Sequence, residues 1–488
     1  MKPIIFFLIF VQIFLVINAE KSKNSTLGVR LSLSGLQFFS NIGHKIVTKE
    51  LPRLALPDIN LPITGGPGDG NVYVSDMKLQ KFESPKFRFY LAPDKGITWR
   101  STGGALKLTG NWNLNYTWVV RIPLSGTVDI TASDIRSVLT LGAYGYQEHP
   151  QIAVYNCTTS VIHLHMSLSG GVIPWIINLF KTPLSAAIKS AIHEEFCDLT
   201  RTVLLREANN ALMKVPTHVE ITENIYMDYG LIHNPVITKK YIQGDALIDV
   251  TIGNKSCDLE MNQVEMIDPG TDDYMANIWF SQSILDCIFK SAHEQNMFKF
   301  VVDKNLQKNL TQFLKTTCSR FSVKDICFGT FFKKLREDYP NQYIDMVFKS
   351  GMPPTTNIDP QSVNVSTLFF IDIHINPYTK NPEPLARLSM STLSDLEPYI
   401  FNDRIVGELQ NTDNKFQQVF STIGDFNPLF LKALELILKP MITVAVDTAF
   451  RIGIPIPLVE NVTFSNTTNL VKLDKQFRID SNLSYLKI

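Results

Sequence analysis

The chain has 488 residues, of which 45% are hydrophobic and 19% are charged, and its 46 basic and 46 acidic side chains cancel. This apolar content is ample for a large buried core and argues against a wholly disordered chain. Because the net charge is zero, there is no overall attraction to nucleic acid, and we expect no nucleic-acid partner. The length allows two to four domains.

The N-terminus predicts secretion. Lys2 precedes an apolar run from Ile4 to Ile17, which is followed by the small residue Ala19. This run of 14 residues is too short to cross a bilayer comfortably. We therefore predict a signal peptide over residues 1–19 and a secreted mature chain, with a retained membrane anchor as the alternative.

Cysteines and glycosylation acceptors agree with secretion. The six cysteines are an even number and include no C-x-x-C pair, which argues against a structural zinc site; we expect neither metal nor cofactor. The acceptor at Asn156 includes Cys157, so we do not count it among the glycosylation candidates. The other N-x-[ST] acceptors are Asn24, Asn115, Asn254, Asn309, Asn364, Asn461, Asn466 and Asn482.

In the first half, helical spacing predicts a helix from about Ser34 to Leu51. A two-residue alternation then predicts long, half-buried antiparallel strands, most clearly between Leu106 and Trp118. An apolar stripe predicts a second, long helix from about Pro174 to Met213, followed by strand-like sequence up to Ile252.

The second half repeats this order. After a polar stretch at 254–273, which we interpret as a linker, the pattern predicts a helix over Ile278–Glu294, several strands, and a long helix over Asn427–Phe450. We therefore predict two similar domains, at 20–253 and 274–488. Each would pair a long helix with a curved antiparallel sheet.

Several short segments also have the order and spacing of a known family. They are Gly28–Arg30, 49–58, Cys157–Met166, Gly171–Phe180, Cys197, Asp228–Leu231, Phe328–Phe331, Arg404–Leu409 and Gly453–Pro457. Taken together, they resemble the lipid-transfer and lipopolysaccharide-binding family, which includes bactericidal/permeability-increasing protein and phospholipid transfer protein. The resemblance covers nearly all of the mature chain.

The resemblance implies an α+β fold, an elongated boomerang of two similar domains. Each domain wraps a highly curved antiparallel sheet around a long helix, and the two share a central sheet. It also implies an apolar pocket for phospholipid acyl chains in each domain, and a disulfide between Cys157 and Cys197. The other four cysteines, Cys257, Cys287, Cys318 and Cys327, allow three pairings.

Enzyme signatures are missing, and we predict no catalysis. The segment His193–Cys197 lacks the second histidine of a zincin, and neither a G-x-S-x-G elbow nor a Walker loop is found. His163 and His165 lie on one strand face but have no acidic or cysteine residue nearby, so we interpret them as a solvated face rather than a metal site.

The apolar faces of the predicted strands and long helices are the functional signal. The alternative interpretation is a plain hydrophobic core, from which spacing alone cannot distinguish a pocket. The candidates for the lipid pockets are Leu106, Leu108, Trp112, Leu114, Trp175, Ile176, Leu179, Phe180, Leu434 and Leu438.

Recognition of bacterial lipopolysaccharide is the alternative function. Residues 20–121 contain 14 basic and 7 acidic residues, but the strand Gly110–Trp118 contains no basic residue. The resemblance suggests a basic tip, for which our candidates are Lys78, Lys81, Lys86 and Arg88. Our leading hypothesis is a secreted, monomeric carrier of phospholipid or another amphipathic lipid. A scaffold holding a structural lipid and, more distantly, a secreted hydrolase remain as further alternatives.

Overall fold

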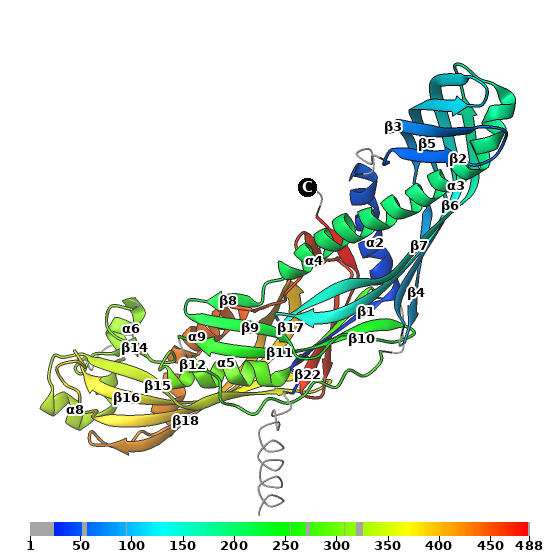
Figure 1. Ribbon diagram of the computed structural model, residues 1–488. Helices are drawn as coiled ribbons and strands as arrows, with labels where there is room; N and C mark the ends of the chain where they lie inside the picture. The colour runs from blue at the N-terminus through cyan, green and yellow to red at the C-terminus, as the bar shows by residue number, and fades with distance from the viewer. Residues whose placement is uncertain are drawn as a thin grey trace, which may run out of the picture.

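The computed structural model describes residues 24–50, 56–93, 95–253, 255–269, 274–306, 308–318 and 326–486, so the predicted signal peptide lies outside the described residues. The molecule is elongated and bent, with one sheet-and-helix unit at each end and a third sheet between them (Figure 1). This is the boomerang of two similar domains that the resemblance implied.

The first unit is a curved antiparallel sheet that follows the order of the chain. Its path is β2 (Ile59–Ile63), β3 (Asp69–Glu83), β5 (Gly96–Thr117), β6 (Arg121–Tyr146) and β7 (His149–Leu168), and the edge strand β4 (Lys86–Ala92) pairs with the first part of β5. Along β5 the buried residues alternate with exposed ones, as the two-residue periodicity predicted.

A long helical segment packs against this sheet. α3 (Pro174–Leu199) continues through a π-helical turn at Thr200–Leu204 into α4 (Leu205–Met213), which matches the helix predicted over Pro174–Met213. Pro174 is the first helical residue, a position where its missing N–H is harmless. The buried residues of α3 and of the sheet form one hydrophobic core.

The second unit has the same design. Its path is β14 (Phe300–Val302), β15 (Ile344–Ile358), β16 (Val363–Ile375), β17 (Ala386–Phe401), β18 (Arg404–Ser421) and β19 (Ile454–Pro455). The long helix α9 (Pro428–Ile452) begins at Asn427, whose Oδ1 accepts a hydrogen bond from the Phe430 N–H at 2.8 Å. The short helices α6 (Lys308–Phe313), α7 (Phe328–Phe331) and α8 (Lys333–Asp338) lie at the far end of this unit (Figure 1).

The central sheet joins the two halves. Its main path is β21 (Asn469–Leu473), β22 (Gln476–Ser481), β13 (Ala276–Ser281), β1 (Leu27–Ser32), β11 (Tyr241–Ile252), β9 (Ile225–Leu231) and β8 (His218–Thr222). The short strands β10 (Val236–Ile237) and β12 (Lys255–Ser256) pair with β11, and β20 (Val462–Phe464) pairs with β23 (Leu483–Tyr485) elsewhere. Because β1 pairs with β13, the strands of the N-terminal half and those of the C-terminal half form one continuous sheet, as expected.

Each half leads from a central strand into a helix: α2 (Leu33–Glu50) follows β1, and α5 (Gln282–Glu294) follows β13. The helix predicted over Ile278–Glu294 was therefore wrong at its start. Residues 276–281 are all buried in the centre of a sheet, and the Ser281 hydroxyl begins α5 by accepting a hydrogen bond from the Ser283 N–H. Among the helices described, none is both long enough and apolar enough to span a membrane.

Candidate functional site

Most of the predicted pocket residues lie in closed cores. Their side chains are at most 6% exposed and pack within the hydrophobic clusters of the first and second units; they are Leu106, Leu108, Trp112, Leu114, Ile176, Phe180, Leu434 and Leu438. Leu179 is partly buried against the first cluster, and Trp175 is 42% exposed. The eight buried residues are core residues, because helix and sheet close upon each other there; this was the alternative interpretation of the pattern.

Nearer the central sheet, the apolar residues of the first unit are less completely buried. There the strands continue as a smaller apolar layer, which we call the proximal layer. Its buried members are Leu91, Ile97, Leu139, Leu141, Cys157 and Cys197, and the hydrophobic residues that pack against them are only partly buried: Leu36, Phe89, Trp99, Val154, Phe196, Leu205, Ile237 and Ile242.

The helices around the proximal layer bury few apolar side chains in their described residues. α4 is strongly amphipathic in sequence but has no buried residue, and Leu33 at the start of α2 is 40% exposed. Between α2 and β4 an open cavity of about 300 Å³ is lined by Leu33, Gln37, Arg88, Phe89 and Tyr90. This volume lies at the lower end of the range for small-molecule pockets.

An aromatic group forms one wall of this region. Trp99 lies opposite Phe89 in the β4–β5 ladder, with the two rings stacked at a centroid distance of 6.3 Å. The indole N–H of Trp99 is buried and has no hydrogen-bond partner among the described residues. The wall is therefore apolar apart from this one buried donor.

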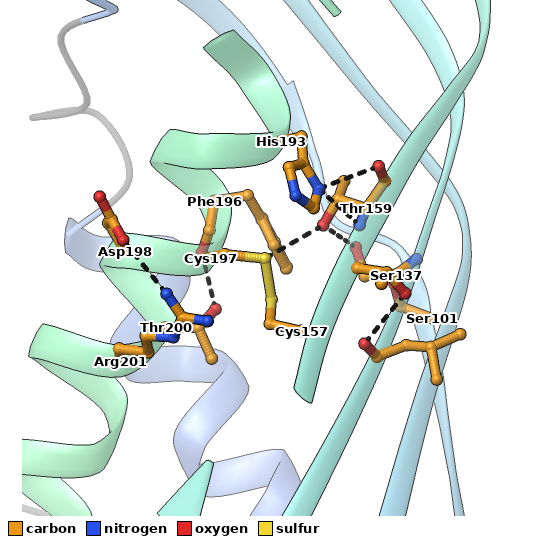
Figure 2. The surroundings of a disulfide bond; sticks show 12 residues. Ser101, Ser137, Cys157, Thr159, His193, Phe196, Cys197, Asp198, Thr200 and Arg201 are labelled. Carbon is orange, nitrogen blue, oxygen red and sulfur yellow. Dashed lines mark hydrogen bonds and ion pairs between the residues drawn. A yellow bond between two sulfur atoms is a disulfide. The ribbon is translucent and has the colours of Figure 1, made fainter. Parts of the chain in front are cut away.

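A disulfide fixes the helix above the proximal layer. Cys157 of β7 and Cys197 of α3 are joined with an S–S distance of 2.00 Å (Figure 2). One helical turn earlier, His193 Nδ1 accepts a hydrogen bond from the Thr159 N–H at 2.9 Å. The segment His193–Cys197 therefore fastens α3 to β7 beside the layer. The remaining cysteines are joined as Cys257–Cys287 and Cys318–Cys327.

In the second half, the end of α9 nearer the central sheet is likewise less buried than its start. In α9 the buried residues are Phe430, Leu434 and Leu438, and none of residues 441–452 is buried. Phe450 near the end of α9 packs edge-on against Phe289 of α5, at a ring distance of 6.0 Å. Both long helices are therefore closed against their sheets at the far ends of the molecule and open toward the central sheet.

The far end of the first unit exposes apolar side chains. The β5–β6 turn and the start of α3 meet there through the Trp118 and Trp175 rings, whose centroids are 6.2 Å apart. We call this end the N-terminal tip (upper right in Figure 1). Trp118 is 54% exposed and Val119 82% exposed; Val120, Val172 and Trp175 are also exposed.

The predicted basic residues do not gather at this tip. Lys86 and Arg88 lie on β4, which pairs with the start of β5, whereas the tip is formed by the other end of β5 at Thr117. At strand spacing the separation along β5 is roughly 55 Å. Lys78 and Lys81 lie on β3 opposite the middle of β5. The placement at the tip was wrong for Lys86 and Arg88, because β4 forms its hairpin at the opposite end of the sheet.

The acceptor asparagines differ in their surroundings. Asn115 and Asn466 are exposed, whereas Asn24 and Asn364 use their amide nitrogens as hydrogen-bond donors, to the Met261 carbonyl and the Ser362 hydroxyl. Asn461 and Asn482 are half-buried in the C-terminal segment, while Asn254 and the side chain of Asn309 lie outside the described residues. His163 and His165 are exposed, and the described ranges contain no cluster of three or more potential metal ligands.

The fold thus defines a class of protein: two curved sheets, each wrapped on a long helix and joined by a shared sheet. The crystal structure of lipopolysaccharide binding protein has this fold; it aligns with a TM-score of 0.61 and 18% identity over 95% of this chain and 100% of that one. The LBP / BPI / CETP family matches at its N-terminal domain over residues 35–207 and at its C-terminal domain over residues 219–485. The chain belongs to this family.

Relatives are distant but match along nearly their whole length. The lipopolysaccharide-binding protein of Homo sapiens is 21% identical, with 95% of each chain covered. The bactericidal permeability-increasing protein of Sebastes schlegelii is 20% identical over 91% of this chain and 92% of its own. The phospholipid transfer protein of Mus musculus is 20% identical over 89% of this chain and 85% of its own.

Proposed function

We propose that this protein is a secreted, non-enzymatic lipid carrier that holds the acyl chains of amphipathic lipids where the long helices lie open, next to the central sheet. The observation that carries the proposal is the proximal layer. There Phe89, Trp99 and Phe196 are only partly buried, whereas most apolar residues of the same sheet are buried farther out. The names of the relatives, which include lipopolysaccharide binding and phospholipid transfer, support the same class of ligand.

Hydrophobic energetics explain how such a site would work without catalysis. Two acyl chains contain about 30 methylenes, and their removal from water is worth roughly 24 kcal/mol at ~0.8 kcal/mol each. Because a bilayer buries the same surface, exchange between membrane and protein is nearly balanced, whereas release into water is strongly unfavourable. The protein then needs only an apolar site and a way to meet the membrane.

The N-terminal tip supports this function by offering a membrane contact. Indole rings favour the interface between lipid and water, and small apolar side chains such as Val119 and Val120 enter the upper acyl region at little cost. Arg121 ends the turn and is exposed beside them. This tip differs from the basic tip that the lipopolysaccharide alternative requires, so we favour phospholipid as the ligand and retain lipopolysaccharide as the second candidate.

The test uses full-length secreted protein that has been stripped of lipid. We expect uptake of fluorescent phosphatidylcholine, a stoichiometry of up to two lipids per chain by native mass spectrometry, and transfer between vesicles. Val119→Asp should slow transfer at least tenfold without lowering uptake of dispersed lipid, because a carboxylate opposes insertion of the tip. Val236→Asp, which alters an exposed valine of the central sheet, is the matched control. Protein that neither takes up nor moves lipid would contradict the proposal.

A further inference from the structure

Three cations stand together on the outer face of the β4–β5 hairpin. Arg88 of β4 and Arg100 of β5 are directly opposite in the ladder, and Lys86 lies two residues before Arg88 on the same face. All three side chains are exposed. Cβ atoms of directly opposite residues are about 5 Å apart, and like charges in this arrangement destabilise a sheet.

Among the residues that the structure describes, acidic side chains do not pair with these cations. Within the described ranges, no carboxylate forms an ion pair with Lys86, Arg88 or Arg100, and Glu83, which precedes them on the hairpin, is paired with Lys81. Arg100 instead lies over the ring of Tyr90 at 5.4 Å. The hairpin therefore holds a positive charge that remains available to an external anion.

The positive charge lies next to the cavity between α2 and β4. Arg88 and Tyr90 line the cavity between α2 and β4, together with the apolar Leu33 and Phe89. Arg100 does not line the cavity itself, but its guanidinium lies over the ring of Tyr90, which does. Apolar groups and guanidinium groups thus meet at one opening, an arrangement suited to a molecule with acyl chains and an anionic end.

We propose that Arg88 and Arg100 form a phosphate subsite at the mouth of the first lipid site and bind the phosphate of an acyl lipid whose chains enter the cavity. Planar guanidinium groups bind phosphate oxygens through paired hydrogen bonds, and Lys86 adds a third positive charge. An anion between the two arginines would also relieve their mutual repulsion. This inference rests on the lipid-carrier function and adds a headgroup preference to it.

The experiment compares two fluorescent lipids with identical acyl chains: phosphatidic acid, which has a phosphate, and diacylglycerol, which has none. Uptake by the delipidated full-length protein is titrated for each lipid. We expect the wild-type protein to bind phosphatidic acid at least tenfold more tightly, and the double variant R88Q/R100Q to bind the two lipids with a ratio near one. Lys107→Gln, which removes an exposed cation elsewhere on β5, should keep the wild-type ratio.

Four results would overturn the subsite. A wild-type ratio near one, or a ratio unchanged in R88Q/R100Q, removes the role of these arginines while leaving the carrier function intact. An equal loss in Lys107→Gln would show a general effect of surface charge. Inorganic phosphate and unlabelled phosphatidic acid are also compared as competitors of the fluorescent phosphatidic acid. If inorganic phosphate displaced it as effectively as unlabelled phosphatidic acid at the same concentration, the site would bind free phosphate and not a lipid headgroup. Failure to take up either lipid would instead refute the carrier function.

Discussion

The two ends of the first sheet-and-helix unit are built from the same strands but are packed differently. Toward the N-terminal tip, Leu108, Trp112 and Phe180 are at most 1% exposed. Toward the central sheet, Phe89, Trp99 and Phe196 are only partly buried, and the helical segment ends in α4, which has no buried residue. The alternation of apolar residues thus decides which face of the sheet turns inward, and the packing of the helical segment decides how completely that face is buried.

The second unit repeats this contrast along α9. Phe430, Leu434 and Leu438 are fully buried, whereas nothing in residues 441–452 is. In both halves the closed part lies outward and the open part lies inward. In both long helical segments, therefore, the end nearer the shared sheet buries fewer apolar side chains than the outer end.

The largest expected effect is on stability in the closed part. Trp112→Ala removes a fully buried ring and its indole hydrogen bond to the Ser169 carbonyl, so we expect a loss of about 3–5 kcal/mol in the free energy of unfolding. Phe89→Ala in the open part should cost less than about 1 kcal/mol but lower lipid affinity. Urea unfolding measures the stability of both variants, and lipid titration measures their affinity. Equal losses of stability in the two variants would contradict the difference in packing between the closed and open parts.

The next effect concerns the disulfide in the proximal layer. Cys157 and Cys197 are 40 residues apart, and closing such a loop stabilises the folded state by about 4 kcal/mol in the chain-entropy account. We expect the double change of both cysteines to serine to reduce secretion and to lower the unfolding midpoint in urea. The disulfide between Cys318 and Cys327 closes a loop of only 9 residues, so the corresponding double variant should lose less stability. The reverse order would contradict this account.

The smallest effect is at the junction of the halves. The Tyr229 hydroxyl donates a hydrogen bond to the Pro455 carbonyl at 2.7 Å, and its loss in Tyr229→Phe should cost about 1 kcal/mol. Burial raises the pKa of Tyr229 well above its ordinary value, although Arg404 opposes this. Its contribution is therefore present below about pH 10 and is lost as the pH rises further. Between pH 9 and 11, the free energy of unfolding should fall more in the wild type than in Tyr229→Phe. Equal falls in both proteins would show that ionisation of Tyr229 is not coupled to stability.

Much of this architecture could be predicted from the sequence, because long helices and strands have strong periodicities. The extents of α3 with α4, and of α9, agree with the apolar stripes, and the family resemblance supplied the central sheet. The apolar run at Ile278 was ambiguous because a strand buried on both faces has no alternation.

The site itself was harder to predict, because it depends on where a helix fails to cover the apolar face of a strand. Leu108 and Phe89 both belong to apolar alternations, and only the position of the neighbouring helix makes one core and the other lining. Arg88 was singled out for its charge, but its position followed from the β4–β5 hairpin, which no local pattern revealed. A sequence signal for the subsite does exist, in the cations Arg88 and Arg100 on adjoining strands, but it becomes visible only once the register is known.

Photo-crosslinking with a phospholipid that has a diazirine in its acyl chain tests the central claim most directly. Delipidated full-length protein is loaded, irradiated, digested and mapped by mass spectrometry. The account predicts labels on peptides from 33–42, 86–100, 196–213 and 441–452, which surround the open ends of the two long helices. Labels concentrated in 106–116 or 430–438, where the cores are closed, or no specific label at all, would contradict it.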